Sequence, residues 1–170
     1  MKRGLYLGRF QPFHNGHLDA VKIGIENSDE LVIMIGSAQH SFTKYNPFTC
    51  TERFEMIERA LKYEGISGDR YHIIPIKDIN NNALWVPEVE LNSPKFEIVF
   101  AGNDLTKSLF AHKGYQIYDL VHQGMGTKIR DMIANDGDWK NEVPKGTLEV
   151  MLEINGTKRI KELYEARQNA

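Results

Sequence analysis

The sequence GLYLGRFQPFHNGH, residues 4–17, joins a short apolar run to a turn and then to the start of a helix. The run Gly4–Gly8 is rich in residues that favour strands. Leu18, Val21 and Ile25 are spaced three and four apart, as on one face of a helix. A strand that passes directly into an amphipathic helix is typical of the first unit of a parallel α/β sheet.

The same alternation of apolar runs and helical patterns continues along the chain. Four further runs are expected to form strands: Leu31–Gly36, Tyr71–Ile76, Phe96–Ala101 and Tyr115–Leu120. Together they predict an α/β fold, with a doubly wound, Rossmann-like parallel sheet of about five strands. Such sheets bind ligands at the carboxyl ends of the strands, where the strand order reverses.

Further helices are predicted beyond the first one. Phe54, Ile57 and Leu61 share one helical face, and this helix has a capping box formed by Thr49 and Glu52. Two last helical patterns, Gly146–Ile154 and Thr157–Arg167, are expected to form helices that pack on this domain rather than form one of their own. No linker or repeat divides the chain, and 170 residues is an ordinary size for one unit. We therefore expect residues 1–170 to form a single domain, with C-terminal helices near residues 146–167.

The composition limits the partners of the protein. The 21 Lys and Arg residues against 23 Asp and Glu give a net charge of −2, so no overall positive field holds nucleic acid or an anionic membrane. The single cysteine, Cys50, cannot form an internal disulfide and is expected to be a small buried side chain. The apolar run at the N-terminus is too short for a signal peptide or a membrane span. These features favour a cytoplasmic protein that binds anions only locally.

The loop after the first predicted strand, Gly8–His17, carries the most informative residues. Gly8 permits close backbone approach, and Gly16 lets a ligand come near the helix start, where free N–H groups favour an anion. His14 and His17 are three apart and face the same way on one helical turn. They form a compact set of donors suited to phosphate oxygens.

Other interpretations of the two histidines stay open on the residues alone. His14 as a helix cap and His17 as a packed core side chain is the more common role of a lone pair with this spacing. A zinc site would need further ligands in a recognisable arrangement, and none stands out, so no metal ligand is assigned. The pattern GxGxxG is absent, which argues against dinucleotide-dependent redox chemistry.

A second anion site is predicted in GMGTKIR, residues 124–130. Thr127 is expected to cap a helix, with Lys128 and Arg130 in its first turn. The helix dipole disfavours cations at that end, so two of them suggest a bound anion. A solvated charged turn explains the same residues equally well on local grounds.

Several motifs resemble one known family. GRFQPFHNGH resembles the HxGH signature of the nucleotidylyltransferase superfamily, whose histidines contact the α- and β-phosphates of a nucleoside triphosphate. Residues 124–130 are similar to the SGTxIR element of archaeal nicotinamide-nucleotide adenylyltransferases. Further matches follow in the same order along the chain: GSAQ (36–39), NPFTCTER (46–53), DI (78–79) with NALW (82–85), GN (102–103) and DGDW (136–139). The similarity runs from about residue 3 to about residue 165, and the chain is identified as a member of the archaeal-type nicotinamide mononucleotide adenylyltransferases.

This resemblance implies two substrate sites. The residues implied for ATP are Gly8, Arg9, Phe10, His14, Gly16, His17, Gly102, Asn103, Thr127, Lys128, Ile129 and Arg130. Those implied for nicotinamide mononucleotide are Ser37, Ile79, Asn82 and Trp85. The expected catalytic donors are His14, His17, Arg9 and Arg130.

The chemistry of two acceptor residues supports the resemblance. The indole of Trp85 can stack on a cationic pyridinium ring, and the amide of Asn82 can pair with a carboxamide. A partly buried tryptophan that anchors a helix is equally compatible with the residues alone.

The chain also departs from the family pattern. Met125 stands where the family has Ser, and Asp131-Met132 replaces a more basic pair. Tyr45 occupies a position where some relatives have Arg, and Lys44 is a candidate substitute for the acceptor phosphate.

The resemblance implies transfer of AMP from ATP to nicotinamide mononucleotide, giving NAD and pyrophosphate. It implies Mg²⁺ bound mainly through the ATP phosphates, and a homo-oligomer, a hexamer. Two other functions stay open: an adenylyltransferase for another acceptor (nicotinate mononucleotide, pantetheine phosphate or flavin mononucleotide) and a non-catalytic nucleotide-binding module. No role is assigned to His40, His72, His112, His122, Asp78, Asp104, Asp119 or Asp138.

Overall fold

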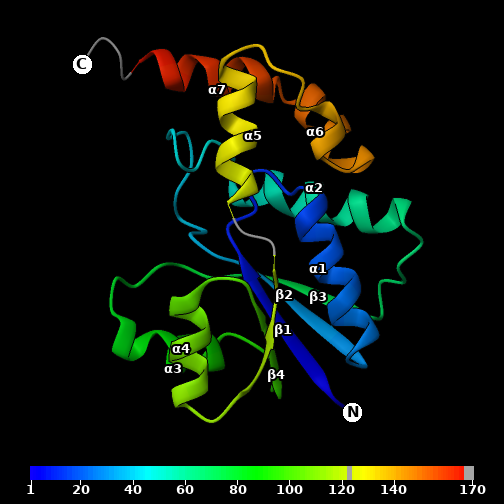
Figure 1. The fold of residues 1–170 in the computed structure, drawn as a ribbon, viewed down its shortest axis with the longest axis vertical. Helices are drawn as coiled ribbons and strands as arrows, with labels where there is room; N and C mark the ends of the chain where they lie inside the picture. The colour runs from blue at the N-terminus through cyan, green and yellow to red at the C-terminus, as the bar shows by residue number, and fades with distance from the viewer. Residues whose placement is uncertain (122–123, 167–170) are drawn as a thin grey trace.

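The computed structural model describes residues 1–121 and 124–166 (Figure 1). In this part of the chain five strands form one parallel sheet in the order β3-β2-β1-β4-β5. Their bounds are β1 Arg3–Gly8, β2 Glu30–Ile35, β3 Tyr71–Pro75, β4 Ile98–Ala101 and β5 Gln116–Asp119. The predicted doubly wound sheet is confirmed, because the strand order reverses between β1 and β4.

Helices cover both faces of this sheet. Their bounds are α1 Asn15–Glu26, α2 Cys50–Tyr63, α3 Asn82–Leu91, α4 Asp104–His112, α5 Met125–Ala134, α6 Lys145–Glu153 and α7 Gly156–Glu165, with a 3₁₀ turn at Lys140–Glu142. Side chains alternate across a strand, so Tyr6 joins the core cluster shared with α1 and α2, while Leu5 joins the cluster shared with α3 and α4. None of the helices in the described ranges is both long and apolar enough to cross a membrane.

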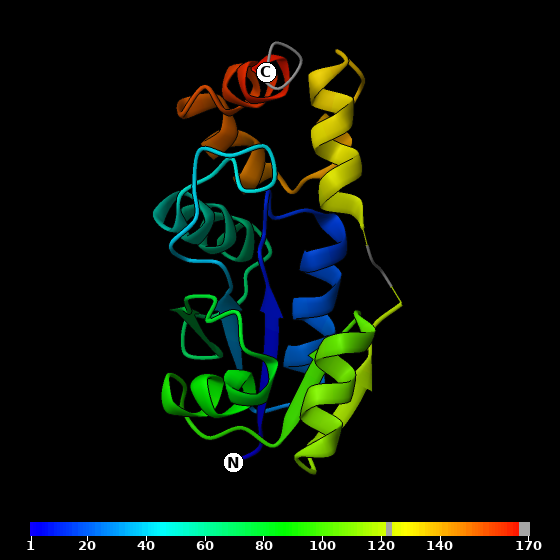
Figure 2. The ribbon, with the colours of Figure 1, turned by 90° about the vertical axis from the view of Figure 1, so that its left-hand side faces the viewer.

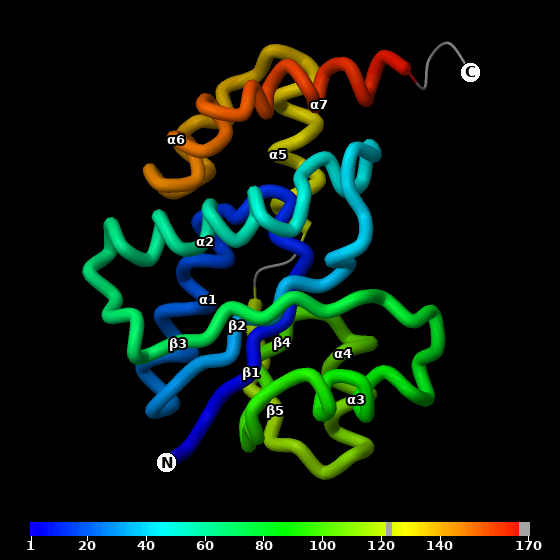
Figure 3. Tube along the Cα trace, turned by 180° about the vertical axis from the view of Figure 1, so that it is seen from behind, coloured from blue at the N-terminus to red at the C-terminus, as the bar shows by residue number. Residues whose placement is uncertain are grey.

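The carboxyl ends of the strands face the C-terminal helices. Figure 2 shows the arrow of β1 pointing toward the end of the molecule where α5, α6 and α7 gather. Figure 3, from behind, shows the segment between β2 and α2 rising toward α7, where the Lys44 ammonium lies 4.1 Å from the centre of the Tyr164 ring. The loop after β2 therefore contacts α7.

Helix α2 begins as predicted but buries a different face. The Thr49 hydroxyl accepts from the Glu52 N–H at 3.1 Å, and the Glu52 carboxylate accepts from the Thr49 N–H at 2.8 Å, which confirms the capping box. The expectation that Phe54 lies on the apolar face is wrong: its side chain is 36% exposed, whereas the neighbouring Arg53 is completely buried. The inward position one residue earlier is taken by Arg53, whose guanidinium binds main-chain carbonyls of the site loops.

The C-terminal helices α6 and α7 pack against helix α2. A Cβ added at Gly146 would lie 2.4 Å from the Ala60 nitrogen, so the glycine lets α6 approach α2 closely. The side chain of Arg159 on α7 binds both carboxylate oxygens of Glu52 at 2.7 and 2.9 Å. The last residue of the predicted helix Thr157–Arg167 lies outside the described residues.

Candidate active site

The loops at the reversal of the strand order line a cavity of about 450 Å³, which we name the main cavity. Its walls come from the end of β1, the start of α1, the segment after β4 and the end of β5. They include many of the residues expected to bind ATP: Gly8, Arg9, His14, Gly16, His17, Gly102 and Asn103. The cavity thus lies where an open parallel sheet binds its ligand.

His14 and His17 begin helix α1 as a reciprocal cap. The His17 main-chain N–H donates to His14 Nδ1, and the His14 main-chain N–H donates to His17 Nδ1, both at 3.3 Å. The rings stack with centroids 3.5 Å apart. Each Nδ1 accepts a hydrogen bond from a main-chain N–H. The hydrogen of a neutral imidazole in this arrangement is therefore on Nε2. The cap and the phosphate-donor interpretations are therefore compatible, because capping engages only one nitrogen of each ring.

The surroundings of His17 keep its imidazole neutral. The ring stacks on Phe13 and meets Phe10 edge to face at a centroid distance of 4.9 Å. Burial, together with the neighbouring His14, holds the pKa of His17 well below its usual value near 6.5. The neutral ring can donate one hydrogen bond from Nε2 at physiological pH.

Helix α5 brings Arg130 to the histidine loop. Its guanidinium is 3% exposed and donates from Nη1 to the Gln11 carbonyl at 2.7 Å and from Nη2 to the Thr127 hydroxyl at 3.1 Å. The Nε atom is buried and has no hydrogen-bond partner among the described residues. Burial lowers the pKa of Arg130, so a nearby anion would stabilise its charge.

A smaller cavity of about 160 Å³ separates the histidine loop from α5. Its lining residues are Arg9, Phe10, Gln11, His14, His17, Gly124, Gly126, Thr127 and Arg130. No carboxylate is among these described residues, while two arginines and two histidines are. The cavity is therefore suited to an anion.

The start of α5 corrects part of the second predicted site. Gly124, with φ of 82°, is the N-cap of α5, so the expectation that Thr127 caps the helix is wrong. No side chain caps this end, and its first N–H groups can receive an anion. Lys128 is exposed in the first turn as expected, but Arg130 belongs to the second turn and is buried.

Two other residues near α5 lie away from the cavity. The Ile129 side chain is completely buried in the core, which leaves only its main chain for a ligand. Met125, at the position where the family pattern has Ser, packs against the same core. Asp131 accepts a hydrogen bond from the Tyr164 hydroxyl at 2.8 Å, so its carboxylate is tied to α7.

A third cavity, of about 190 Å³, lies between the segment after β3 and helix α4. Ile79, Asn82 and Trp85, all expected to bind the acceptor, line it together. Trp85 is half-buried and also packs against the core, so it anchors α3 and faces the cavity. Ser37 does not line this cavity itself. Its hydroxyl donates to the carboxylate of Asp78 at 2.6 Å, and Asp78 is one of the lining residues.

Asp78 is a candidate acceptor residue to which no role was assigned from the sequence. Its position just beyond β3, at the carboxyl edge of the sheet, was the available signal. The side chain of Gln39 also binds the main chain of Asp78. It donates to the Asp78 carbonyl at 3.0 Å and accepts from the Asp78 N–H at 3.1 Å.

The first turn of α4 lies between the main cavity and the third cavity. Asn103 lines the main cavity, whereas Leu105 and Thr106 line the third. The Asn103 carboxamide oxygen accepts from the Thr106 N–H at 2.8 Å as the cap of α4. Its amide NH₂ is the group left to contact a nucleotide.

The remaining predicted residues have ordinary surroundings. Cys50 is half-buried at the start of α2 rather than fully buried as expected, and burial raises the pKa of its thiol. His72 contacts Glu30 at 3.1 Å, and His112 contacts the Ser108 carbonyl at 2.6 Å. His122 lies outside the described residues. Within residues 1–121 and 124–166, no group of three or more His, Cys, Asp or Glu side chains is placed to hold a metal ion.

Fold and cavities together define a nucleotide-binding α/β protein of the HxGH type. The family model described as cytidylyltransferase-like matches residues 5–143. The nicotinamide-nucleotide adenylyltransferase of Pyrococcus furiosus is 47% identical over 171 residues, covering 96% of this chain and 89% of the relative. That of Methanococcus aeolicus is 47% identical over 166 residues, covering 95% and 94%. The chain belongs to the nicotinamide-nucleotide adenylyltransferase family, within the cytidylyltransferase-like group.

Solved structures share the fold. A bifunctional NMN adenylyltransferase/ADP ribose pyrophosphatase from Francisella tularensis superposes with a TM-score of 0.86 at 23% identity. The match covers 99% of this chain and 54% of that one, so this chain spans about half of the Francisella protein. A nicotinic acid mononucleotide adenylyltransferase from Plasmodium falciparum matches with a TM-score of 0.63 at 14% identity, covering 92% and 97%.

Proposed function

We propose that this protein transfers AMP from ATP to nicotinamide mononucleotide, forming NAD and releasing pyrophosphate. The observation that carries the proposal is the cavity between the histidine loop and α5, whose lining combines Arg9, His14, His17 and Arg130 with no carboxylate. The family membership supports the same reaction. The larger cavity beside it has room for the nucleoside, and the third cavity for the acceptor base.

The nucleophile is an oxygen of the acceptor phosphate. A phosphate monoester has a second pKa of about 6, so this oxygen is ionised at neutral pH and needs no general base. It attacks the α-phosphorus of ATP in line, the bond to the bridging oxygen breaks, and pyrophosphate leaves with the electron pair. The protein brings two anions together and stabilises the charge that develops on the leaving group.

The described side chains divide this work. The Nε2–H groups of His14 and His17 donate to phosphate oxygens, and the Arg130 guanidinium holds the outer phosphates with its planar fork. Asn82, Trp85, Ile79 and, through Asp78, Ser37 shape the acceptor site. Ile129 contributes its main chain, while Lys128 adds positive charge at the rim.

Magnesium enters with the ATP phosphates in this proposal. The described part of the site has no carboxylate cluster to cage the ion, which fits an ion held by phosphate oxygens and water. When bound, it neutralises phosphate charge. A Francisella structure is described with AMP and a manganese ion, so manganese should be tested beside magnesium.

We further propose that residues 1–170 act as one domain, assembled as a cytoplasmic homo-oligomer, a hexamer. The shared core cluster that contains Val150, Met151 and Ile160 supports one domain, and the single cysteine suits a reducing compartment. Light scattering on the purified protein gives the oligomeric state directly.

The reaction is tested by incubating the purified protein with ATP, a divalent ion and one acceptor at a time. We expect NAD and pyrophosphate in equal amounts with nicotinamide mononucleotide. Nicotinate mononucleotide, pantetheine phosphate and flavin mononucleotide are run in parallel. A faster reaction with pantetheine phosphate or flavin mononucleotide contradicts the proposed acceptor, and no pyrophosphate with any acceptor contradicts the reaction itself.

A further inference from the structure

Arg53 is a completely buried cation that binds main chain from several segments of the site. Its Nη1 donates to the Arg9 carbonyl at 2.9 Å and to the Gly36 carbonyl at 2.7 Å. Its Nη2 donates to the Ser37 carbonyl at 3.1 Å, and its Nε to the Thr49 carbonyl at 3.2 Å. One guanidinium therefore joins the loop after β1, the loop after β2 and the cap of α2.

This arrangement is costly for stability alone. No carboxylate lies within ion-pair distance of Arg53 among the described residues, and burial lowers the pKa of its guanidinium. An apolar side chain of similar size would avoid burying a charge, although it would leave the four carbonyls without this donor. Two of the segments it binds, the loops after β1 and β2, do, however, lead to the groups that the proposed reaction must bring together.

The two loops lead to different substrates. Arg9 begins the histidine loop, which lines the anion cavity. Ser37 donates to Asp78, which lines the acceptor cavity. We propose that Arg53 is a positioning residue: it fixes the histidine loop against the acceptor loop, so that the two bound substrates meet in line. This inference rests on the proposed function.

Arginine is required because of its shape. The planar guanidinium offers donors in fixed directions, and both of its terminal nitrogens are used here on carbonyls of different loops. A lysine ammonium is a point donor on a flexible stem and cannot span the same carbonyls at once.

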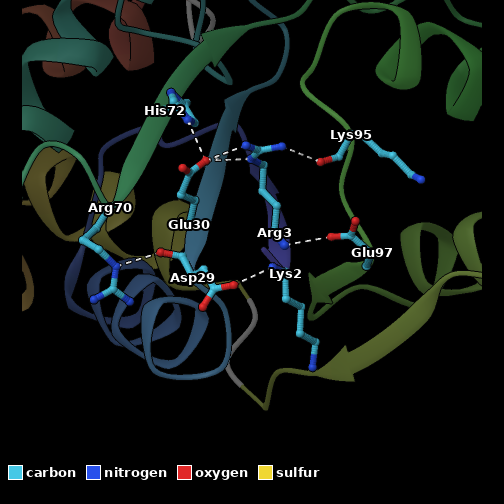
Figure 4. Close-up of polar contacts among 8 residues, drawn as sticks. All are labelled: Lys2, Arg3, Asp29, Glu30, Arg70, His72, Lys95 and Glu97. Carbon is cyan, nitrogen blue, oxygen red and sulfur yellow. Dashed lines mark hydrogen bonds and ion pairs between the residues drawn. The ribbon is translucent and has the colours of Figure 1, made fainter.

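The test uses Arg53→Lys with Arg70→Lys as a matched control. Arg70 also donates to three main-chain carbonyls, those of Asp29 at 2.8 Å, Ile25 at 2.8 Å and Ser28 at 3.2 Å. It does so at the amino ends of the strands, away from the cavities, as Figure 4 shows for its contact with Asp29. Both changes remove the same kind of contact, but only one lies between the substrate loops.

We expect Arg53→Lys to lower kcat about 100-fold, because misplacement by about 1 Å can cost that much. The dissociation constants of nicotinamide mononucleotide alone and of a non-hydrolysable ATP analogue alone, measured by calorimetry, should change less than about threefold, since each loop still binds its own ligand. Arg70→Lys should lower the melting temperature and leave kcat unchanged. Activity is measured well below both melting temperatures.

Other outcomes overturn the inference. An Arg53→Lys protein with kcat close to that of the wild type removes the positioning role while leaving the proposed function intact, and so does an equal loss of kcat in Arg70→Lys. An inactive wild type removes the proposed function and this inference with it.

If Arg53→Lys does not fold, side-chain NMR of the arginine-labelled wild type decides. The two ligands are added in separate samples. Shifts of the Arg53 guanidinium signals in both samples support the coupling, whereas a shift in only one sample or in neither overturns it.

Discussion

The Arg3 cluster at the amino ends of the strands and the arginines of the candidate site at the carboxyl ends bind opposite kinds of partner. At the amino ends, Arg3 donates from Nε and Nη2 to one oxygen of Glu30 at 2.9 and 2.6 Å, and His72 contacts the same oxygen at 3.1 Å (Figure 4). At the carboxyl ends, Arg53 and Arg130 bind only uncharged oxygens. No carboxylate lies within ion-pair distance of Arg9, Arg53, Lys128 or Arg130 in the described part of the chain.

This difference shows which end of the sheet holds positive charge that is available to a ligand. At the amino ends the partners are already present, so the cluster adds stability and attracts no further anion. At the carboxyl ends, positive charge is held in place by carbonyls, which orient the guanidinium groups without neutralising them. A phosphate entering there meets donors that are already ordered. The following changes test this contrast, and three of them pair one residue from each end.

The largest effect is expected for His17→Ala. Removing one donor to the developing charge should lower kcat by about 10²–10³-fold. The paired change His72→Ala removes a histidine at the amino ends and should leave kcat unchanged. Steady-state kinetics of both variants, with circular dichroism to check folding, measure the contrast. A folded His17→Ala protein with wild-type turnover would mean that this histidine only caps α1.

Arg130→Lys should have the next largest effect. The change removes the fork that binds Gln11 and Thr127 and faces the anion cavity. We expect kcat/KM for ATP to fall about 10- to 100-fold, because a hydrogen bond to a charged group contributes about 1.5–3 kcal/mol. Arg3→Lys is the partner at the amino ends and should lower only the melting temperature. Equal loss of kcat/KM in both variants would erase the distinction between the two ends.

Trp85→Ala should act on the acceptor alone. Loss of stacking on a cationic ring, worth about 0.5–2 kcal/mol, should raise the KM for nicotinamide mononucleotide by about 3- to 30-fold while the KM for ATP stays unchanged. Leu84→Ala, which alters an exposed neighbour on the same helix, is the control. If Trp85→Ala instead raises the KM for ATP, the third cavity is not the acceptor site.

The fold could be predicted because its signals are local. Each apolar run occupies the strand that it predicted within a residue or two, and the Thr49–Glu52 box lies within one turn. Strand and helix alternation then leaves few topologies. The HxGH loop was equally visible, since both histidines lie on one turn of α1.

The parts that could not be predicted depend on distant main chain. No role was predicted for Arg53, because three of its four carbonyl acceptors lie 16, 17 and 44 residues away. Asp78 meets Ser37 across 41 residues, through the pairing of β2 with β3. The start of α5 depends on the left-handed backbone of Gly124. A pattern of side chains does not predict that conformation.

The smallest effect concerns the pH at which each end loses stability. The pKa of His17 is lowered in the folded protein by burial and by His14, so between its usual and its folded pKa the unfolded chain binds the extra proton. Stability therefore falls as the pH drops below about 6.5, by at most about 1.4 kcal/mol per pH unit for one proton. Hydrogen bonds from Arg3 and then His72 lower the pKa of Glu30 from 4.5, and the contribution of Glu30 to stability is lost only as the pH falls below that value.

The melting temperature is therefore measured from pH 7 to 5. It should decline less for His17→Gln, which cannot titrate, than for the wild type, while Glu30→Gln follows the wild-type slope. Parallel declines of wild type and His17→Gln would show that the histidine loop does not hold this imidazole neutral.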